Sequence, residues 1–177
     1  MPPTGAGGTS TALAAQRSDR GGRRWPTVGL IVAVGSVLLL RLFVVEPVEV
    51  ASSSMAPTLR AGDHVLTESA SLRLGAVRRG DLVTFAAAGS DELTLKRVAA
   101  LGGDRVAIHD GRLVVNRRSV PEPYADHRRM DSIYFGPVDV PAGSVFVLGD
   151  NRDDSRDSRD IGPVPVRDLV GRVVLTW

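Results

Sequence analysis

The sequence predicts a mostly β protein, with a single N-terminal transmembrane helix followed by an extracytoplasmic domain built as an antiparallel β-sheet or barrel-like fold. Two observations predict this. The one long apolar run of the 177-residue chain lies at residues 26–45, and beyond residue 46 the apolar residues gather in short Val-, Leu- and Ile-rich runs. Glycine and proline, 19 and 11 residues, separate these runs in the way expected of strands joined by turns.

The first 45 residues predict a tail and a membrane anchor. Residues 1–25 are rich in small and polar residues with four arginines near the end, so we expect a disordered cytoplasmic tail. Residues 26–45 make about 20 residues, or roughly 30 Å of helix, which is enough to cross a bilayer core. Arg41 lies near the far end, where its charge can extend to the headgroups.

The flanking charges predict the orientation of this anchor. Arginines precede the apolar run and Glu46 and Glu49 follow it, which places the N-terminus in the cytoplasm and residues 46–177 outside. The alternative is a cleaved signal peptide. Cleavage after Ala51 would put Glu49 at a position where a small residue is needed, so the pattern favours an uncleaved anchor.

Beyond the anchor, the apolar runs predict eight strands. Asp110-Gly111 between two of them is typical of a type I′ hairpin turn. Residues 117–142 contain four prolines and scattered charges, so we expect an irregular excursion from the sheet there. The expected strands are Val48–Ala51, His64–Thr67, Leu82–Ala86, Leu93–Ala100, Arg105–His109, Arg112–Asn116, Ser144–Leu148 and Leu169–Thr176.

Composition excludes several kinds of site. The chain has no cysteine, so it forms neither disulfides nor cysteine metal sites. The net charge is only +2 and basic residues alternate with acidic ones, which does not favour a nucleic-acid partner. The acidic run 150–160 has Ser155 where a calcium loop needs glycine, and arginines interrupt it. We therefore expect no metal and no cofactor.

A serine cluster directly after the apolar run is a candidate nucleophile site. Residues 52–59 hold three serines and a proline, and a serine hydroxyl needs a base to become a nucleophile. Lys96 is the single lysine beside 21 arginines, and lysine can lose its proton whereas arginine cannot. We therefore predict a Ser54/Lys96 dyad. The alternatives are a lysine left by chance in an arginine-rich composition, and a histidine base, for which His64 is the candidate.

The proposed base needs a lowered pKa. A free lysine has a pKa of about 10.4 and is almost fully protonated at pH 7, so the site must desolvate Lys96. Strand alternation places Thr94, Lys96 and Val98 on one face and Arg97 on the other. We therefore expect Arg97 to point away from Lys96.

Four motifs in order resemble the sequence boxes of bacterial type I signal peptidases. They are Ser54–Leu59, Gly80–Phe85, Lys96–Val98 leading to Gly103-Asp104, and Gly149–Arg159. The resemblance covers the chain from about residue 26 to its end. It implies a membrane-bound serine endopeptidase that cleaves signal peptides from exported preproteins after small residues, with residues 46–177 as its catalytic domain and membrane lipid beside it.

The resemblance also implies roles for individual residues. Ser54 is the nucleophile and neutral Lys96 the general base, while the Ser52 hydroxyl and the Ser54 N–H form the oxyanion hole and Ser155 orients the amine. The mixed acidic and basic run 150–160 itself favours ion pairs of Asp157 with Arg159 or Arg152, which hold Ser155 in place. The implied supporting residues are Asp150, Arg152, Asp157 and Arg159, and the implied substrate-pocket walls are Val50, Ala51 and Leu95.

The chain departs from the family pattern at three positions. Ala51 and Ser53 stand where the family usually has proline and glycine, and Asp154 stands where it usually has asparagine.

Two other functions remain alternatives. A self-cleaving repressor protease shares the dyad but needs an N-terminal DNA-binding domain, and a non-catalytic anchored β domain that binds peptides or partner proteins would not depend on Lys96.

Overall fold

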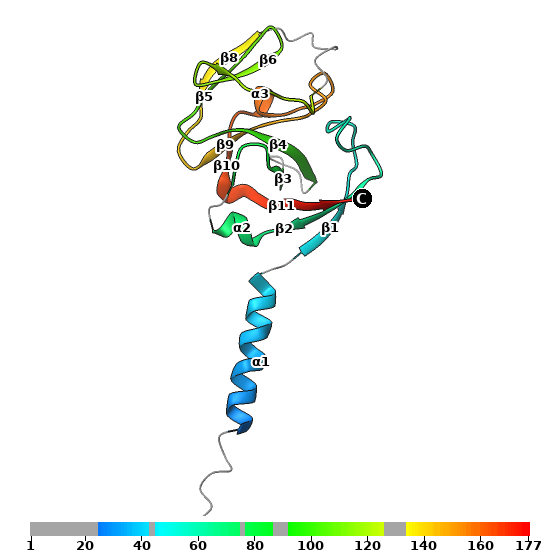
Figure 1. Ribbon diagram of the computed structural model, residues 1–177, viewed down its shortest axis with the longest axis vertical. Helices are drawn as coiled ribbons and strands as arrows, with labels where there is room; N and C mark the ends of the chain where they lie inside the picture. The colour runs from blue at the N-terminus through cyan, green and yellow to red at the C-terminus, as the bar shows by residue number, and fades with distance from the viewer. Residues whose placement is uncertain (1–24, 43–44, 75–76, 87–91, 126–133) are drawn as a thin grey trace, which may run out of the picture. The chain divides into compact units, whose positions relative to one another are not determined.

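The computed structural model describes residues 25–42, 45–74, 77–86, 92–125 and 134–177 (Figure 1). The chain divides into two units, Met1–Leu39 and Leu40–Trp177. Helix α1 (Trp25–Leu42) covers residues 26–42 of the predicted anchor and begins one residue before it, while Val45, the last predicted anchor residue, is in a strand. Apart from Trp25, the predicted tail is outside the described residues. Among the described residues, no helix reaches the length and hydropathy that define a membrane span.

The second unit consists of two antiparallel sheets, which confirms the mostly β prediction. The larger sheet has the order β1-β2-β11-β3-β4-β9-β10 and the smaller one β7-β6-β5-β8. The strands of the larger sheet are β1 (Val45–Glu49), β2 (His64–Glu68), β3 (Leu82–Ala86), β4 (Leu93–Leu101), β9 (Ser144–Leu148), β10 (Val164–Pro165) and β11 (Leu169–Thr176). Those of the smaller sheet are β5 (Arg105–His109), β6 (Arg112–Val115), β7 (Arg118–Ser119) and β8 (Tyr134–Asp139).

Short helical turns complete the unit. They are α2 (Ala70–Arg73), α3 (Ser158–Ile161) and the 3-10 turn η2 (Val166–Asp168). Most strand predictions agree with the structure within a residue or two. The first does not, because β1 begins earlier, at Val45, where it pairs with Glu68 of β2. Asp110 and Gly111 both have positive φ, 48° and 71°, as the predicted hairpin turn requires.

The segment 117–142 is less irregular than predicted. It contains β7 and also β8, which pairs with β5 at an edge of the smaller sheet. Gly136 and Pro137 interrupt the apolar alternation of β8, which hides the strand in the sequence. An edge position explains why the proline is accepted, since an edge strand can lack one N–H donor.

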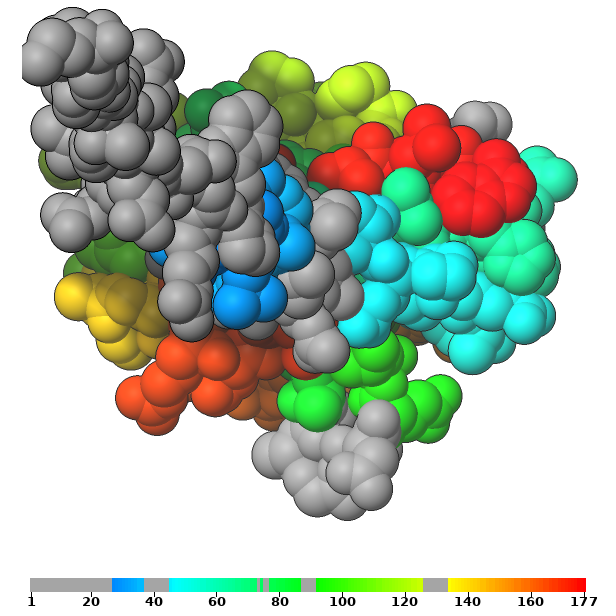
Figure 2. Space-filling view, turned by 90° about the horizontal axis from the view of Figure 1, so that it is seen from below, coloured from blue at the N-terminus to red at the C-terminus, as the bar shows by residue number. Residues whose placement is uncertain are grey.

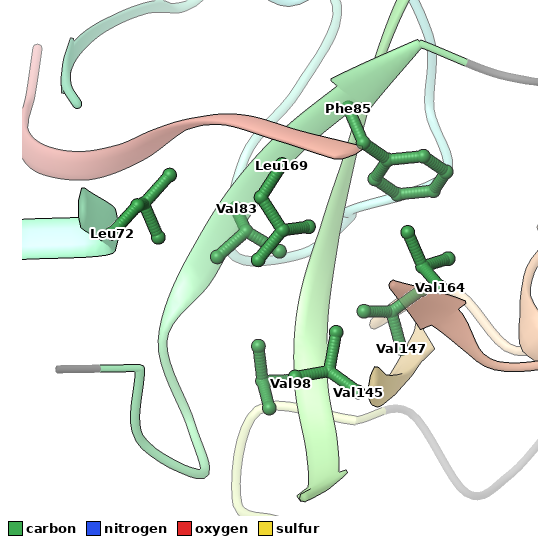
Figure 3. Packing of buried hydrophobic residues seen from close by; sticks show 8 residues of the cluster. All are labelled: Leu72, Val83, Phe85, Val98, Val145, Val147, Val164 and Leu169. Carbon is green, nitrogen blue, oxygen red and sulfur yellow. The ribbon is translucent and has the colours of Figure 1, made fainter. Parts of the chain in front are cut away.

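Strand β9 lies between two apolar cores. Its residues are all buried, as the unbroken apolar run 144–148 requires. Val145 and Val147 face one cluster, shown in Figure 3, and Phe146 and Leu148 face the other. The first cluster contains Leu72, Val83, Phe85, Val98, Val145, Val147, Val164 and Leu169, and the second contains Ala99, Ala100, Val106, Leu113, Val115, Val140, Phe146 and Leu148.

A third, smaller cluster lies beneath the serine-rich segment. Val50, Met55, Leu59 and Val65 are buried together, and Met55 has no exposed surface. Strand β11 pairs with β2 nearby, and the His64 and Trp177 backbones exchange hydrogen bonds of 3.1 and 3.0 Å. Figure 2 shows the resulting surface, with the red C-terminal atoms beside those of residues 45–68. This cluster fixes the loop that carries Ser54.

Candidate active site

Ser54 lies in a tight turn that is held from below by its apolar neighbours. The turn is closed by hydrogen bonds from Ala56 N to Ser53 O and from Leu59 N to Met55 O, both 3.0 Å. Met55 and Leu59 enter the third core cluster. Ser52 and Ser53 are exposed, whereas Ser54 is buried to 8% exposure beside the fully buried Met55.

The Lys96 amine meets this hydroxyl. Lys96 lies in β4 opposite Val83 of β3, and its Nζ donates to Ser54 Oγ at 2.7 Å. The lysine is only 3% exposed. Residues 42 positions apart are thus brought into contact, as the dyad hypothesis expects.

Burial is the main influence on the Lys96 pKa and lowers it from the ordinary value of 10.5. The negative charges of Asp157, Asp154 and Asp150 raise this pKa and so oppose the shift, while Arg159 adds to the lowering. The net direction is downward. A lysine with a lowered pKa has a larger neutral fraction near neutral pH and can accept a proton from the serine.

The two other predicted serines lie close to the dyad. Ser52 Oγ donates to Ser54 Oγ at 3.1 Å. Ser155 Oγ donates to Asp157 Oδ2 at 3.0 Å, and within the described residues it makes no hydrogen bond to the Lys96 amine that it is predicted to orient. Gly149 lies between Ser155 and the Ser54 backbone, because a Cβ added at Gly149 would stand 2.7 Å from Ser54 O and closer still to Ser155 Oγ.

The peptide groups on both sides of Ser54 are fixed by Asn151. Its backbone N donates to Ser54 O at 3.0 Å, and its Nδ2 donates to Ser53 O at 3.2 Å. The N–H and C=O of a trans peptide point in opposite directions. Two donors on Ser53 O, from Ala56 and Asn151, therefore direct the Ser54 N–H away from them and leave that N–H available to a ligand.

Residues 149–157 face the turn that carries Ser54, and we call them the site loop. Asp157 lies at the C-terminal end of this loop. Asp157 is fully buried and caps α3. Its carboxylate accepts from Gly149 N at 3.0 Å and from Arg159 Nε at 2.9 Å. Arg159 NH2 also donates to Arg152 O at 2.6 Å. Asp157 at one end of the site loop is therefore joined to Gly149 at the other end, and its ion pair with Arg159 holds it in this position.

The partners of Asp150 and Arg152 were not predicted from the sequence. Asp150 accepts two bonds from Arg97, at 2.8 Å to Nε and 2.6 Å to NH2. Arg152 pairs with Glu122, and both side chains are 1% exposed. Arg97 does point away from Lys96, as the strand alternation expects, but only the fold shows that it reaches Asp150. Glu122 lies between two prolines in the sequence, but its burial is seen only in the structure.

A pocket of about 260 Å³ opens beside Ser54 and Lys96. All three predicted wall residues line it. The pocket is also lined by other members of the two segments expected to flank the substrate, residues 48–51 and 93–95, whereas Glu92 and Arg156 line it and were not predicted. The lining consists of Val48, Glu49, Val50, Ala51, Ser52, Ser54, Met55, Thr84, Glu92, Leu93, Thr94, Leu95, Lys96, Asp154 and Arg156.

The two described histidines, His64 and His109, have other ring partners and do not support the histidine alternative. His64 is exposed at the start of β2, and its ring stacks on Trp177 at 6.0 Å between centroids. His109 contacts Tyr134, and His127 lies outside the described residues. Lys96 is the basic side chain that contacts the Ser54 hydroxyl.

Two of the residues that depart from the family pattern contact each other. Ser53 Oγ donates to Asp154 Oδ2 at 2.6 Å. The bond joins the turn that carries Ser54 to the site loop. Asp154 also lines the pocket and lies close enough to Lys96 to influence its pKa.

Comparison with known proteins gives the family. Residues 24–177 match the family described as signal peptidase, peptidase S26. The signal peptidase I of Bacillus caldolyticus is 38% identical over 170 residues, which cover 89% of this chain and 91% of that protein. That of Bacillus licheniformis is 37% identical over 139 residues, which cover 74% and 75%.

A crystal structure of a signal peptidase I from Enterococcus faecalis V583 is also similar, with 30% identity, a TM-score of 0.49, and coverage of 56% of this chain and 97% of that one. The extent of the family match and the identity to the Bacillus caldolyticus enzyme lead to one conclusion. The chain belongs to the signal peptidase family, peptidase S26, whose members are serine peptidases that cleave signal peptides.

Proposed function

We propose that this signal peptidase uses Ser54 as its nucleophile and neutral Lys96 as its general base. The observation that carries the proposal is the 2.7 Å contact of Lys96 Nζ with Ser54 Oγ in a buried site. The contact lies within hydrogen-bond reach for direct proton transfer. A non-catalytic peptide-binding domain would have no need of a buried amine at this hydroxyl.

The proton follows a closed path in this mechanism. Ser54 Oγ attacks the scissile carbonyl carbon as its proton passes to Lys96 Nζ, and the resulting ammonium gives that proton to the leaving amine. Water then attacks the acyl-enzyme and gives its proton to the neutral amine, which returns it to Ser54 Oγ. The Ser54 N–H and the Ser52 hydroxyl are the donors for the oxyanion, where charge develops in the transition state.

The site loop has the role of support in this proposal. Ser155 and Asp157 stand behind the dyad, and Asp157 is held by Arg159. Asp150 and Arg152 hold the loop through Arg97 and Glu122. None of them contacts the Ser54 hydroxyl; they act by holding the site loop, and the charges of Asp157, Asp150 and Arg159 also act on the Lys96 pKa.

Pocket shape supports a substrate with small side chains. Val50, Ala51 and Leu95 line the pocket near Ser54, so a signal peptide that lies extended along residues 48–51 and 93–95 would place its side chains against them. A small residue before the cleavage site fits such walls. Large side chains would meet Val50 and Leu95.

We also propose that residues 26–45 anchor the chain as a single span, with residues 1–25 in the cytoplasm and residues 46–177 as the extracytoplasmic catalytic domain in contact with membrane lipid. Helix α1 covers most of this range. Val28, Leu30, Ile31, Val32 and Val34 on it are all at least half exposed. Apolar side chains exposed around a helix are typical of a segment that faces lipid.

The experiment that tests the function uses the full-length chain. Membranes are washed with alkaline carbonate, which leaves a spanning protein in the pellet and releases a peripheral one. The chain is then purified in detergent and incubated with a preprotein, and the product N-terminus is sequenced. We expect one cut after a small residue, and none in a matched preprotein with large residues at that site. A preprotein that stays intact between pH 6 and 10 would contradict the function.

Asp154→Asn is expected to move the pH dependence of cleavage. The Asp154 charge raises the Lys96 pKa, so its removal lowers that pKa further. Because the rate rises with pH as Lys96 loses its proton, the rising limb should shift to lower pH. The asparagine side chain can still accept the Ser53 hydrogen bond. The measurement is kcat/KM against pH, with Asp153→Asn as the control of equal charge change. A limb that stays in place or moves upward contradicts this role.

A further inference from the structure

One acidic side chain in the segment 117–142 is buried although its neighbours are not. Glu122 is 5% exposed, whereas Pro121 and Pro123 on either side are exposed. A carboxylate is rarely buried unless it is paired with a cation and hydrogen-bonded. The side chain of Glu122 therefore needs a partner inside the fold, and that partner lies in the site loop.

Glu122 pairs with Arg152, and this pair reaches the backbone of the site loop. The guanidinium NH2 of Arg152 donates to Glu122 Oε1, and its Nε donates to Gly149 O at 2.9 Å. Within the part of the chain that the structure describes, Arg152 NH1 has no hydrogen-bond partner. Glu122 is therefore the carboxylate that compensates a guanidinium buried to 1% exposure.

Tyr124 makes a second connection two residues further on. The Arg97 guanidinium carbon lies 4.0 Å from the centre of the Tyr124 ring, which is a cation–π geometry. Arg97 in turn holds Asp150 of the site loop with two hydrogen bonds. Burial raises the pKa of Tyr124 to about 12, so the ring carries a neutral hydroxyl under ordinary conditions.

Both connections end on Gly149 and Asp150 of the site loop. These residues lie next to the turn of residues 53–59 that carries Ser54, which we call the nucleophile turn. Gly149 and Asp150 are followed directly by Asn151, whose N and Nδ2 hold the peptide groups on either side of Ser54. A Cβ added at Gly149 would stand 2.7 Å from Ser54 O, so the two backbones lie close together. A shift of the loop would therefore be transmitted to the Ser54 N–H and Oγ.

We propose that Glu122 and Tyr124 are positioning residues that hold the catalytic serine in place, through Arg152 and Arg97 of the two connections. The inference rests on the proposed role of Ser54. Neither side chain touches the dyad, and neither is among the groups that dominate the Lys96 pKa. They act on the geometry of attack, for which a misplacement of about 1 Å can cost roughly 100-fold in rate.

Glu122→Gln in the full-length enzyme tests the first connection. The amide keeps the shape of the side chain but removes the charge that compensates Arg152. We expect kcat for preprotein cleavage to fall at least about tenfold while KM changes less than about twofold, because a small displacement of Ser54 affects attack more than substrate binding. The pH position of the rising limb should not move. Asp139→Asn, which breaks the exposed Arg105–Asp139 pair, is the control and should cleave like the wild type.

A double variant separates positioning from simple support of the fold. Glu122→Leu with Arg152→Met removes both buried charges together, which restores stability in many buried pairs. It also removes the donor to Gly149 O. We expect the double variant to melt near the wild-type temperature and still cleave slowly. If its kcat returns to the wild-type value, the pair only supports the fold and the proposal is wrong.

Tyr124 gives an independent test. Tyr124→Phe keeps the ring over Arg97 and loses only the 3.4 Å hydrogen bond from the Tyr124 hydroxyl to Glu122 Oε1, so it should cleave within about twofold of the wild-type rate. Tyr124→Leu should lower kcat about threefold or more because the cation–π contact is also lost. Equal rates for the two variants would overturn the role of the ring. A wild-type enzyme that cleaves no preprotein would contradict the proposed function instead, so the two failures are distinct.

Discussion

Lys96→Arg is expected to reduce preprotein cleavage by about 10⁶-fold, the scale of loss when the general base of a serine protease is removed. Arginine keeps the positive charge and approximate length of lysine, but its guanidinium does not lose a proton in a protein. The wild-type rate should rise with pH on a limb that lies below the ordinary lysine value of 10.5, because burial lowers the Lys96 pKa. In Lys96→Arg this limb should be absent.

The control for this prediction is Lys96→Met, which removes the base and the buried charge together. The folded-state pKa of Lys96 lies below its unfolded value, so between these two values the unfolded chain binds more protons and stability falls as the pH falls. Lys96→Met lacks this loss and should be inactive yet at least as stable as the wild type at pH 7. Cleavage by either variant at a near-normal rate would mean that the base lies elsewhere.

Gly149→Ala is expected to reduce cleavage by about 100-fold without any change in a reacting group. The added Cβ would stand 2.7 Å from Ser54 O and even closer to Ser155 Oγ. Ser54 O is backbone and cannot rotate away, so the nucleophile turn and the site loop must separate. We expect a loss of about 1–3 kcal/mol in unfolding free energy, as is typical of an overpacked site.

The measurement is kcat/KM for preprotein cleavage, together with thermal unfolding of the same sample. Gly35→Ala in α1 adds the same methyl group where nothing lies within 4 Å, and it should keep normal activity. A Gly149→Ala enzyme with wild-type kcat/KM would show that the contact of the site loop with the Ser54 backbone does not affect the rate of cleavage.

Local pattern was sufficient to predict most of the fold. Strands β3, β5, β9 and β11 have the predicted bounds, because each is an apolar run bounded by turn residues. Strand β8 was missed for the opposite reason, since Gly136-Pro137 breaks its alternation and only the pairing with β5 makes it a strand. Strand pairing between distant segments is not written in a local pattern.

The candidate site was also only partly predictable from the sequence. Residue chemistry points to Lys96 as a possible base, because it is a single lysine among 21 arginines. The resemblance of Ser54–Leu59 and Lys96–Val98 to the family's sequence boxes supports the choice of both residues. The partners of Arg97 and Arg152 could not be predicted. Each arginine could pair with any of several acids, and burial decides between them. Asp150 and Glu122 lie 53 and 30 residues from their partners, so only the folded chain brings them together.

The single lysine of the chain has a practical consequence for spectroscopy. A sample with isotope-labelled lysine carries one labelled side chain, and this side chain contacts the Ser54 hydroxyl. Its nitrogen and carbon resonances report one titration without overlap, in the resting enzyme and with peptide bound. Because the other long basic side chains are arginines, isotope labelling of lysine alone reports the protonation of the buried Lys96 amine. No mutation and no chemically attached probe is required.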